Sequence, residues 1–152
     1  MHEELDRETV ARTLHEVEAI AAAVHIPRTI ERDGEMLQGH FKLPGGRHQR
    51  VYVRVSGRTT TGLRVLTLFS VFHHLKDGEG LSASELRALL LVNEHQRFVR
   101  VAIWPMDGDE LLVVSWDQIL ETMEAEELAT QVRSLVLAAD ELEKLLSDDD
   151  RF

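Results

Sequence analysis

Eight histidines are the residues of this sequence best suited to metal chemistry, because imidazole is a common ligand of transition metals. Neighbouring strands could bring His40, His48, His73 and His74 close together. Adjacent residues of a regular strand point to opposite faces, however, so His73 and His74 could not both bind one ion. The sequence contains no cysteine and no H-E-x-x-H motif, which excludes cysteine zinc sites, disulfides and thiolate catalysis. We therefore expect neither a metal nor a cofactor.

Paired carboxylates are the second set of groups that could do chemistry, as a general acid and base. Asp107 and Asp109 flank a glycine, which is the composition of a turn. Glu124, Glu126 and Glu127 stand where a helix should begin, and negative charge is favoured there by the helix dipole. No nucleophile or electrophile accompanies either set, so we expect a protein that is not an enzyme.

Charge is distributed unevenly along the chain, whose formal net charge is -10. Residues 1–80 hold eleven basic and eleven acidic residues, whereas residues 81–152 hold six and sixteen. Within the first half, residues 36–76 contain no carboxylate at all. We therefore expect one basic and one acidic region on the molecule.

The basic region suggests an alternative function, which is binding of nucleic acid. Lys42, Arg50, Tyr52 and Arg54 would share one exposed sheet face, where cations could meet phosphates and an aromatic ring could stack on a base. Only one aromatic residue is predicted there, and the acidic second half opposes a polyanion. Direct contact with nucleic acid is thus the second hypothesis rather than the first.

Hydrophobic periodicity predicts the elements that would position these groups. Apolar residues at three- and four-residue steps indicate helices, and alternation of apolar and polar residues indicates strands. The segment 28–32 could add a short edge strand. In order, we expect a helix over 3–24, strands over 35–43, 48–56 and 62–74, a helix from residue 82, a hairpin with its turn at 106–109, and a helix over 122–146 with Thr122 as its N-cap.

The stretch 81–116 is the best specified part and is expected to be the centre of the fold. Ser82 and Glu85 form a capping box, and Leu86, Leu89 and Leu90 follow at helical spacing. If Leu89 or Leu90 is buried, its replacement by alanine should lower the unfolding free energy more than removal of the Ser82 cap does.

Two surfaces are expected to bind other chains. The third strand is apolar on both faces, and this excess predicts a homodimer with Leu66, Leu68 and Phe72 in its interface. The last helix is strongly acidic and should attract a basic protein, such as one that itself binds nucleic acid. The partner-binding residues expected on it are Glu124, Glu126, Glu127, Asp140, Glu141 and Glu143.

The element order α-βββ-α-ββ-α is uncommon, and it resembles that of the YbjN family and, more remotely, of the type III secretion chaperones. The likeness is sharpest over 81–116, where a leucine-rich helix closing on Val92-Asn93-Glu94 leads into the pair FVRVAIW and ELLVVSW. The resemblance implies a single α+β domain over 1–152 with an antiparallel sheet, no catalytic residues and a homodimeric, chaperone-like protein that binds other proteins. The acidic start of the chain and the lack of a long apolar run lead us to expect a cytoplasmic protein without a membrane span.

Overall fold

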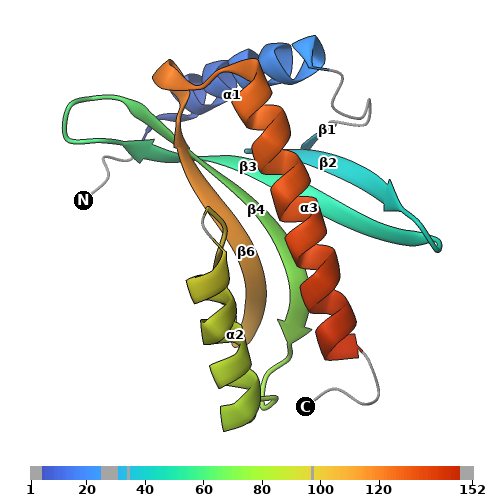
Figure 1. Cartoon of the computed structure of the whole chain (residues 1–152). Helices are drawn as coiled ribbons and strands as arrows, with labels where there is room; N and C mark the ends of the chain where they lie inside the picture. Colours follow the sequence, from blue (N-terminus) through green and yellow to red (C-terminus); the bar gives the residue numbers. More distant parts are fainter. Residues whose placement is uncertain (1–4, 25–30, 34, 97, 148–152) are drawn as a thin grey trace.

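The computed structural model describes residues 5–24, 31–33, 35–96 and 98–147. The fold is α+β, and the order α-βββ-α-ββ-α expected from the sequence is confirmed, with a short additional strand at the start of the sheet (Figure 1). The elements are α1 (Arg7–Ala23), β1 (Glu31–Asp33), β2 (Met36–Leu43), β3 (Arg47–Arg58), β4 (Arg64–Leu75), α2 (Ala83–His95), β5 (Arg100–Met106), β6 (Asp109–Ile119), a single 3-10 turn η1 (Leu120–Thr122) and α3 (Ala125–Ser147). The edge strand expected over 28–32 falls partly outside the described residues, and β1 covers its end.

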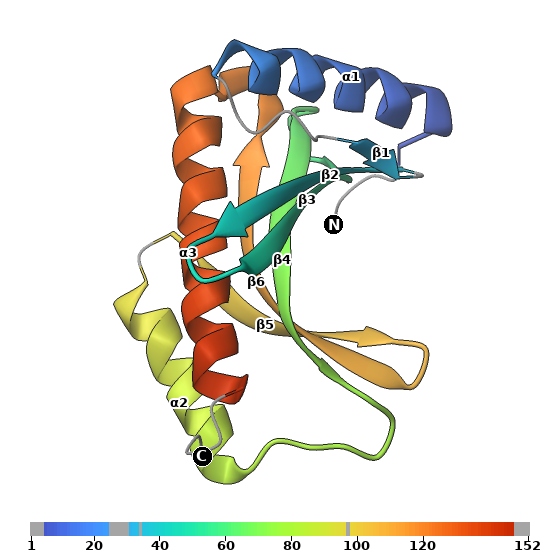
Figure 2. The same ribbon diagram turned by 90° about the vertical axis from the view of Figure 1, so that its right-hand side faces the viewer.

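The six strands form one antiparallel sheet in the order β1-β2-β3-β4-β6-β5. β3 and β4 pair from Arg58 and Arg64 to Tyr52 and Phe69. β3 begins at Arg47, however, and β4 continues to Leu75. The start of β3 therefore diverges from the end of β4, and the β2–β3 hairpin points away from the lower half of β4 (Figures 1 and 2).

All three helices contribute buried residues to one hydrophobic cluster on one face of the sheet, and α3 crosses that face (Figure 1). This packing corrects the dimer interface expected from the sequence. Leu66 and Leu68 are 0% exposed and Phe72 is 4% exposed, because they lie in the cluster beneath the helices. The apolar side chains on this face of β4 are thus buried within the subunit, and these three residues are core residues.

The helix α2 begins as the sequence predicts but does not lie at the centre of the fold. Ser82 accepts a hydrogen bond from the Glu85 amide, and the Glu85 carboxylate accepts one from the Ser82 amide. Leu89 is the buried residue of this helix, at 4% exposure, whereas Leu90 is 69% exposed. The condition of burial on which the expected cost of the alanine replacements depends is thus met by Leu89 and not by Leu90, because α2 packs at the β5 edge rather than across the sheet.

The hairpin between β5 and β6 closes through the Asp-Gly turn that the sequence indicates. Asp107 and Gly108 both have positive φ, at 45° and 89°, as a type I′ turn requires. Thr122 was expected as the N-cap of the last helix, but it lies in η1, and α3 starts three residues later. There the Glu124 amide donates a hydrogen bond to the Glu127 carboxylate.

Within the described residues, no three histidine, aspartate or glutamate side chains gather as a metal site would require. None of the described helices is long and apolar enough to cross a membrane.

Candidate binding surfaces

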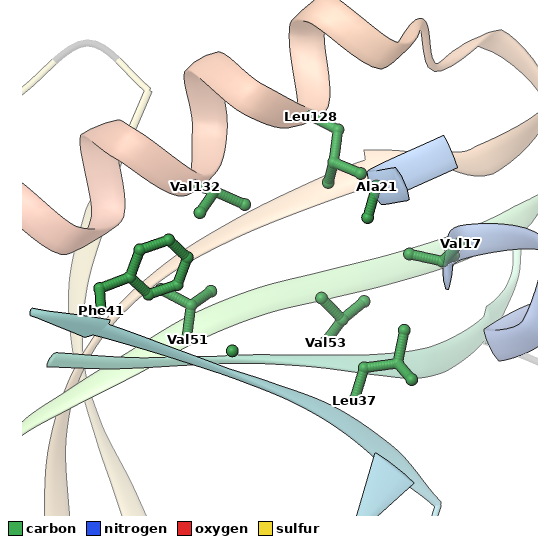
Figure 3. Close-up of a pocket in the computed structure, with 9 residues that line it drawn as sticks. Val17, Ala21, Leu37, Phe41, Val51, Val53, Leu128 and Val132 are labelled. Carbon is green, nitrogen blue, oxygen red and sulfur yellow. The ribbon is translucent and has the colours of Figure 1, made fainter. Parts of the chain in front are cut away.

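A small apolar pocket lies in the corner where α1 and α3 meet the sheet (Figure 3). Its volume is about 30 Å³, enough for a small apolar group. We call it the helix groove. Its walls are Val17 and Ala21 of α1, Leu128 and Val132 of α3, and Leu37, Gly39, Phe41, Val51 and Val53 of β2 and β3.

Gly39 keeps the floor of the helix groove open. A Cβ atom placed on this residue would lie 3.0 Å from Cε2 of Phe41, so the ring would have to shift to accommodate it. On β3, Val51 and Val53 reach the groove because alternate side chains of a strand point to the same face. An alanine at position 39 would therefore narrow this pocket without demanding an unusual backbone.

Arg64 of β4 connects α1 to η1, the turn that precedes α3. Its guanidinium donates to Thr13 and Glu16 of α1 over 2.9 to 3.1 Å, and its Nε donates to Glu121 of η1 over 2.8 Å. The hydrogen bonds from Arg64 lower the pKa of Glu16. Burial opposes ionisation of Glu121, but its hydrogen bonds with Arg64 outweigh that effect and lower the pKa of this carboxyl too. Three elements are thus tied together through one side chain.

The acidic residues expected to bind a partner fall into two groups on α3. Glu124, Glu126, Glu127 and Glu141 are exposed, and the first three lie in the turn that precedes Leu128 of the helix groove. Asp140 was also expected on the surface, but it is only 8% exposed.

Asp140 and Glu143 instead hold the end of the β2–β3 hairpin. Arg47 donates to the Asp140 carboxylate from Nε over 2.7 Å and to its carbonyl oxygen over 3.1 Å, and Lys144 lies 3.1 Å from the same carboxylate. Glu143, which is half-buried, accepts a hydrogen bond from Gln49. Asp140 therefore serves the packing of α3 against β3, which a charge count of the helix could not reveal.

Exposed apolar side chains gather at the opposite edge of the molecule, where α2 meets β5. Asn93 joins the two elements, since its amide donates to the Val101 carbonyl and its oxygen accepts from the Val101 amide. Leu86 and Leu90 lie beside Asn93 on the helix surface at a spacing of four residues, and Ile103 follows Val101 on the same face of β5. Leu86 is 38%, Leu90 69% and Ile103 42% exposed. We call these three residues the edge patch.

The other face of the sheet carries no described helix and is both basic and aromatic. Lys42, Arg50 and Arg54 are exposed there, as the sequence predicts, and Tyr52 is half-buried. Tyr52 stacks on Phe69, with ring centroids 5.1 Å apart, and Phe69 contacts Trp104 over 4.7 Å.

This face therefore has three clustered aromatic rings, where the sequence predicted one. The guanidinium of Arg54 lies 4.5 Å from the centroid of Trp104. Trp104 and Phe69 were missed because they belong to β5 and β4, and only the strand order brings them beside Tyr52. The alternation of FVRVAIW was the available signal, since it places Trp104 on the face opposite Ile103.

Asp109, one of the two carboxylates of the β5–β6 turn, has a structural use. Asp109 accepts a hydrogen bond from the Asp77 amide over 2.7 Å and lies 2.8 Å from Nε2 of His74. The hydrogen bond with His74 lowers the pKa of Asp109, which keeps this carboxylate ionised as an acceptor.

No protein-family model matches this sequence, and no curated protein is significantly similar to it.

Proposed function

We propose that this chain is a non-enzymatic, homodimeric protein-binding factor of chaperone-like type, as the resemblance to the YbjN family implies. The observation that carries the proposal is the helix groove with its acidic rim. The groove would receive a small apolar group at the tip of a partner's side chain, and the exposed glutamates beside it would attract a basic segment around that anchor. A chaperone-like protein of this kind would act in the cytoplasm.

The acidic rim fits this role better than a purely structural one. Glu124, Glu126 and Glu127 are exposed within one turn of Leu128. In the sequence from 107 to 150, the basic residues are Arg133 and Lys144 alone, so most of the carboxylates there have no basic neighbour in sequence. Charges around an apolar anchor accelerate association more than they strengthen the final complex. A basic partner, such as a protein that binds nucleic acid, would therefore be steered to the groove and held there by apolar contact.

The dimer is proposed to form through the edge patch. Large exposed apolar patches often mark contacts between chains, and the edge patch combines leucines of a helix with the last strand of the sheet. Asn93 binds the backbone groups of Val101, so the part of β5 from Ile103 onward is the part whose outer edge can meet a second copy. This location replaces the one expected on β4.

Light scattering coupled to size exclusion tests the dimer. The wild type should have twice the chain mass of 17.3 kDa, and Leu90→Glu should have the chain mass. Leu137→Glu is the matched control, because Leu137 is also an exposed leucine on a helix, at 53%, but it lies on α3. At micromolar concentration, a wild type of single-chain mass, or a Leu90→Glu variant that remains dimeric, would contradict the proposal.

Affinity capture from the native cell, followed by binding kinetics with the captured protein, tests the groove. Gly39→Ala should weaken binding chiefly by faster dissociation, because it narrows the apolar pocket. Replacement of Glu124, Glu126 and Glu127 by glutamine should slow association several-fold at low salt. A glutamine side chain at position 127 would retain an oxygen for the Glu124 amide, so the start of α3 should be preserved.

The matched control for the charge change is the triple replacement of Glu79, Glu94 and Glu110 by glutamine, since these exposed residues lie away from α3. It removes the same charge and should leave the association rate much closer to that of the wild type. If both triple variants slowed association equally, net charge rather than the rim would be responsible. If Gly39→Ala bound as the wild type does, the groove would not be the site.

A further inference from the structure

Two hollows that share residues join into one trough along the helix-free face of the sheet. The first, of about 390 Å³, lies where β3 diverges from β4 and is lined by His40, His48, Gln49, Arg50, Tyr52 and Val71 and, from α3, by Glu143. The second, of about 490 Å³, shares Tyr52 and Val71 and continues across the sheet. The two are therefore neighbouring parts of a single depression, with a basic end and an aromatic end. We call it the sheet trough.

The basic end is suited to carboxylates. It lies in the region 36–76, which contains no acidic residue, and Arg50 and His48 are exposed within it. Glu143, the acidic residue that lines this hollow, is half-buried and accepts a hydrogen bond from Gln49, whereas Arg50 is exposed. The charged group that faces solvent most fully at this end is thus the guanidinium of Arg50.

The aromatic end is suited to an apolar side chain beside a further carboxylate. Phe69, Trp104 and Met106 line it together with Arg54. Arg54 stacks its guanidinium on Trp104, and such stacking uses the flat face of the group while the N–H donors at its edge remain able to bind a carboxylate.

The divergence of β3 from β4 adds a backbone feature to the trough. Pairing of these strands ends at Tyr52 and Phe69, and Ser70 closes the angle between them by donating from Oγ to the Arg50 carbonyl over 2.6 Å. From Val71 onward β4 pairs with β6 alone among the described strands. Within the described residues, the other edge of this part of β4 pairs with no strand, and an extended peptide can add to an unpaired edge.

We propose that the sheet trough binds an extended acidic peptide segment of another protein. The segment pairs as a strand with β4 beyond Ser70, places carboxylates at Arg50 and Arg54, and lays an apolar side chain on the cluster of Tyr52, Phe69 and Trp104. A nucleic acid matches these features less well, because it cannot pair with a strand edge.

The site lies on the opposite face of the sheet from the helix groove. It would take a ligand of opposite charge, so the inference does not depend on the proposed function.

The probe is a labelled peptide of about eight residues with glutamate, leucine and glutamate at successive alternate positions and threonine between them, so that as a strand it directs both kinds of side chain to the same face. Fluorescence anisotropy measures its affinity. In a Trp116→Phe protein, Trp104 is the remaining tryptophan and reports directly on the aromatic end. The same measurements are made with a proline-substituted peptide and with a labelled oligothymidylate.

We expect saturable binding of the peptide with a change in Trp104 fluorescence. Arg50→Glu should weaken it about tenfold, because an attraction becomes a repulsion. Arg133→Glu makes the same charge change on the exposed surface of α3 and should leave the affinity unchanged. Gly39→Ala should also leave it unchanged, which separates the trough from the helix groove.

Three results would overturn the proposal. The first is the absence of peptide binding, and the second is equal loss of affinity in Arg50→Glu and Arg133→Glu. The third is tighter, Arg50-dependent binding of the oligothymidylate, which would assign the trough to single-stranded nucleic acid. Equal affinity for the proline-substituted peptide would remove the strand pairing on which the proposed orientation depends.

Discussion

Adjacent leucines on α2 should respond very differently to the same substitution. Leu89 is 4% exposed and belongs to the core cluster, while Leu90 is 69% exposed. Leucine and alanine both have high helix propensity, so either change to alanine leaves the helix itself little affected. The difference between the two variants therefore measures burial.

The expected magnitudes follow from the position of α2. Removal of a buried leucine side chain costs ~2 to 5 kcal/mol of unfolding free energy, depending on how far the site can relax. Because α2 packs at the sheet edge, relaxation should be easy, and we expect about 2 to 3 kcal/mol for Leu89→Ala. For a chain of this length that corresponds to a fall in Tm of roughly 2 to 4 °C per kcal/mol. Leu90→Ala should change the stability of the single subunit by at most about 0.5 kcal/mol.

Urea unfolding followed by circular dichroism measures both values. Dimerisation adds a concentration-dependent contribution to the measured unfolding free energy. The titrations must therefore be made at a concentration low enough for light scattering to show single chains. At higher concentration Leu90→Ala should lose stability relative to the wild type, because its contact lies between subunits. Equal destabilisation of the two variants in the single-chain regime would refute the description of α2 as an edge helix with one buried leucine.

The hydrogen bonds of Arg64 and the capping box of α2 give three further expectations. Arg64→Met should lower the unfolding free energy by about 2 kcal/mol in urea titrations, since it removes charge-assisted bonds to Glu16 and Glu121 that are partly screened by solvent. Both carboxyls have a lower pKa in the folded state, so the folded protein binds fewer protons; their stabilisation should be complete above pH 4.5 and lost as the pH falls below it. This acid-dependent loss should be smaller in Arg64→Met, and equal loss in both proteins would mean that other groups cause it. Ser82→Ala should cost ~1 kcal/mol in the same titration, and a negligible cost would show that the capping box adds nothing to α2.

Local signals in the sequence were sufficient for the element order. The capping box at Ser82, the Asp-Gly turn at Gly108 and the alternation along β2 and β3 each depend on neighbouring residues, and each was confirmed. The start of α3 was predicted three residues too early, because Thr122 is a good capping residue that the chain uses in a 3-10 turn instead.

The assignment of apolar residues to core or surface could not be predicted in the same way. Leu66 of β4 and Leu90 of α2 both occupy regular apolar positions, but the helices cover the first and no described element covers the second. The burial of charged side chains could not be predicted from the sequence either. Asp140 and Glu141 are adjacent acids on one helix, and only the approach of Arg47 from a hairpin distant in sequence buries the first.

The strand β3 has side chains in both proposed sites. Val51 and Val53 line the helix groove, while Arg50, Tyr52 and Arg54 line the sheet trough on the reverse side. A ligand that shifts or stiffens this strand from one side changes the site on the other. Because linkage between two binding equilibria is reciprocal, the basic partner proposed for the groove and the acidic segment proposed for the trough would then alter each other's affinity by the same factor. The alternation of one strand thus provides a physical route by which occupancy by one partner can regulate capture of a second.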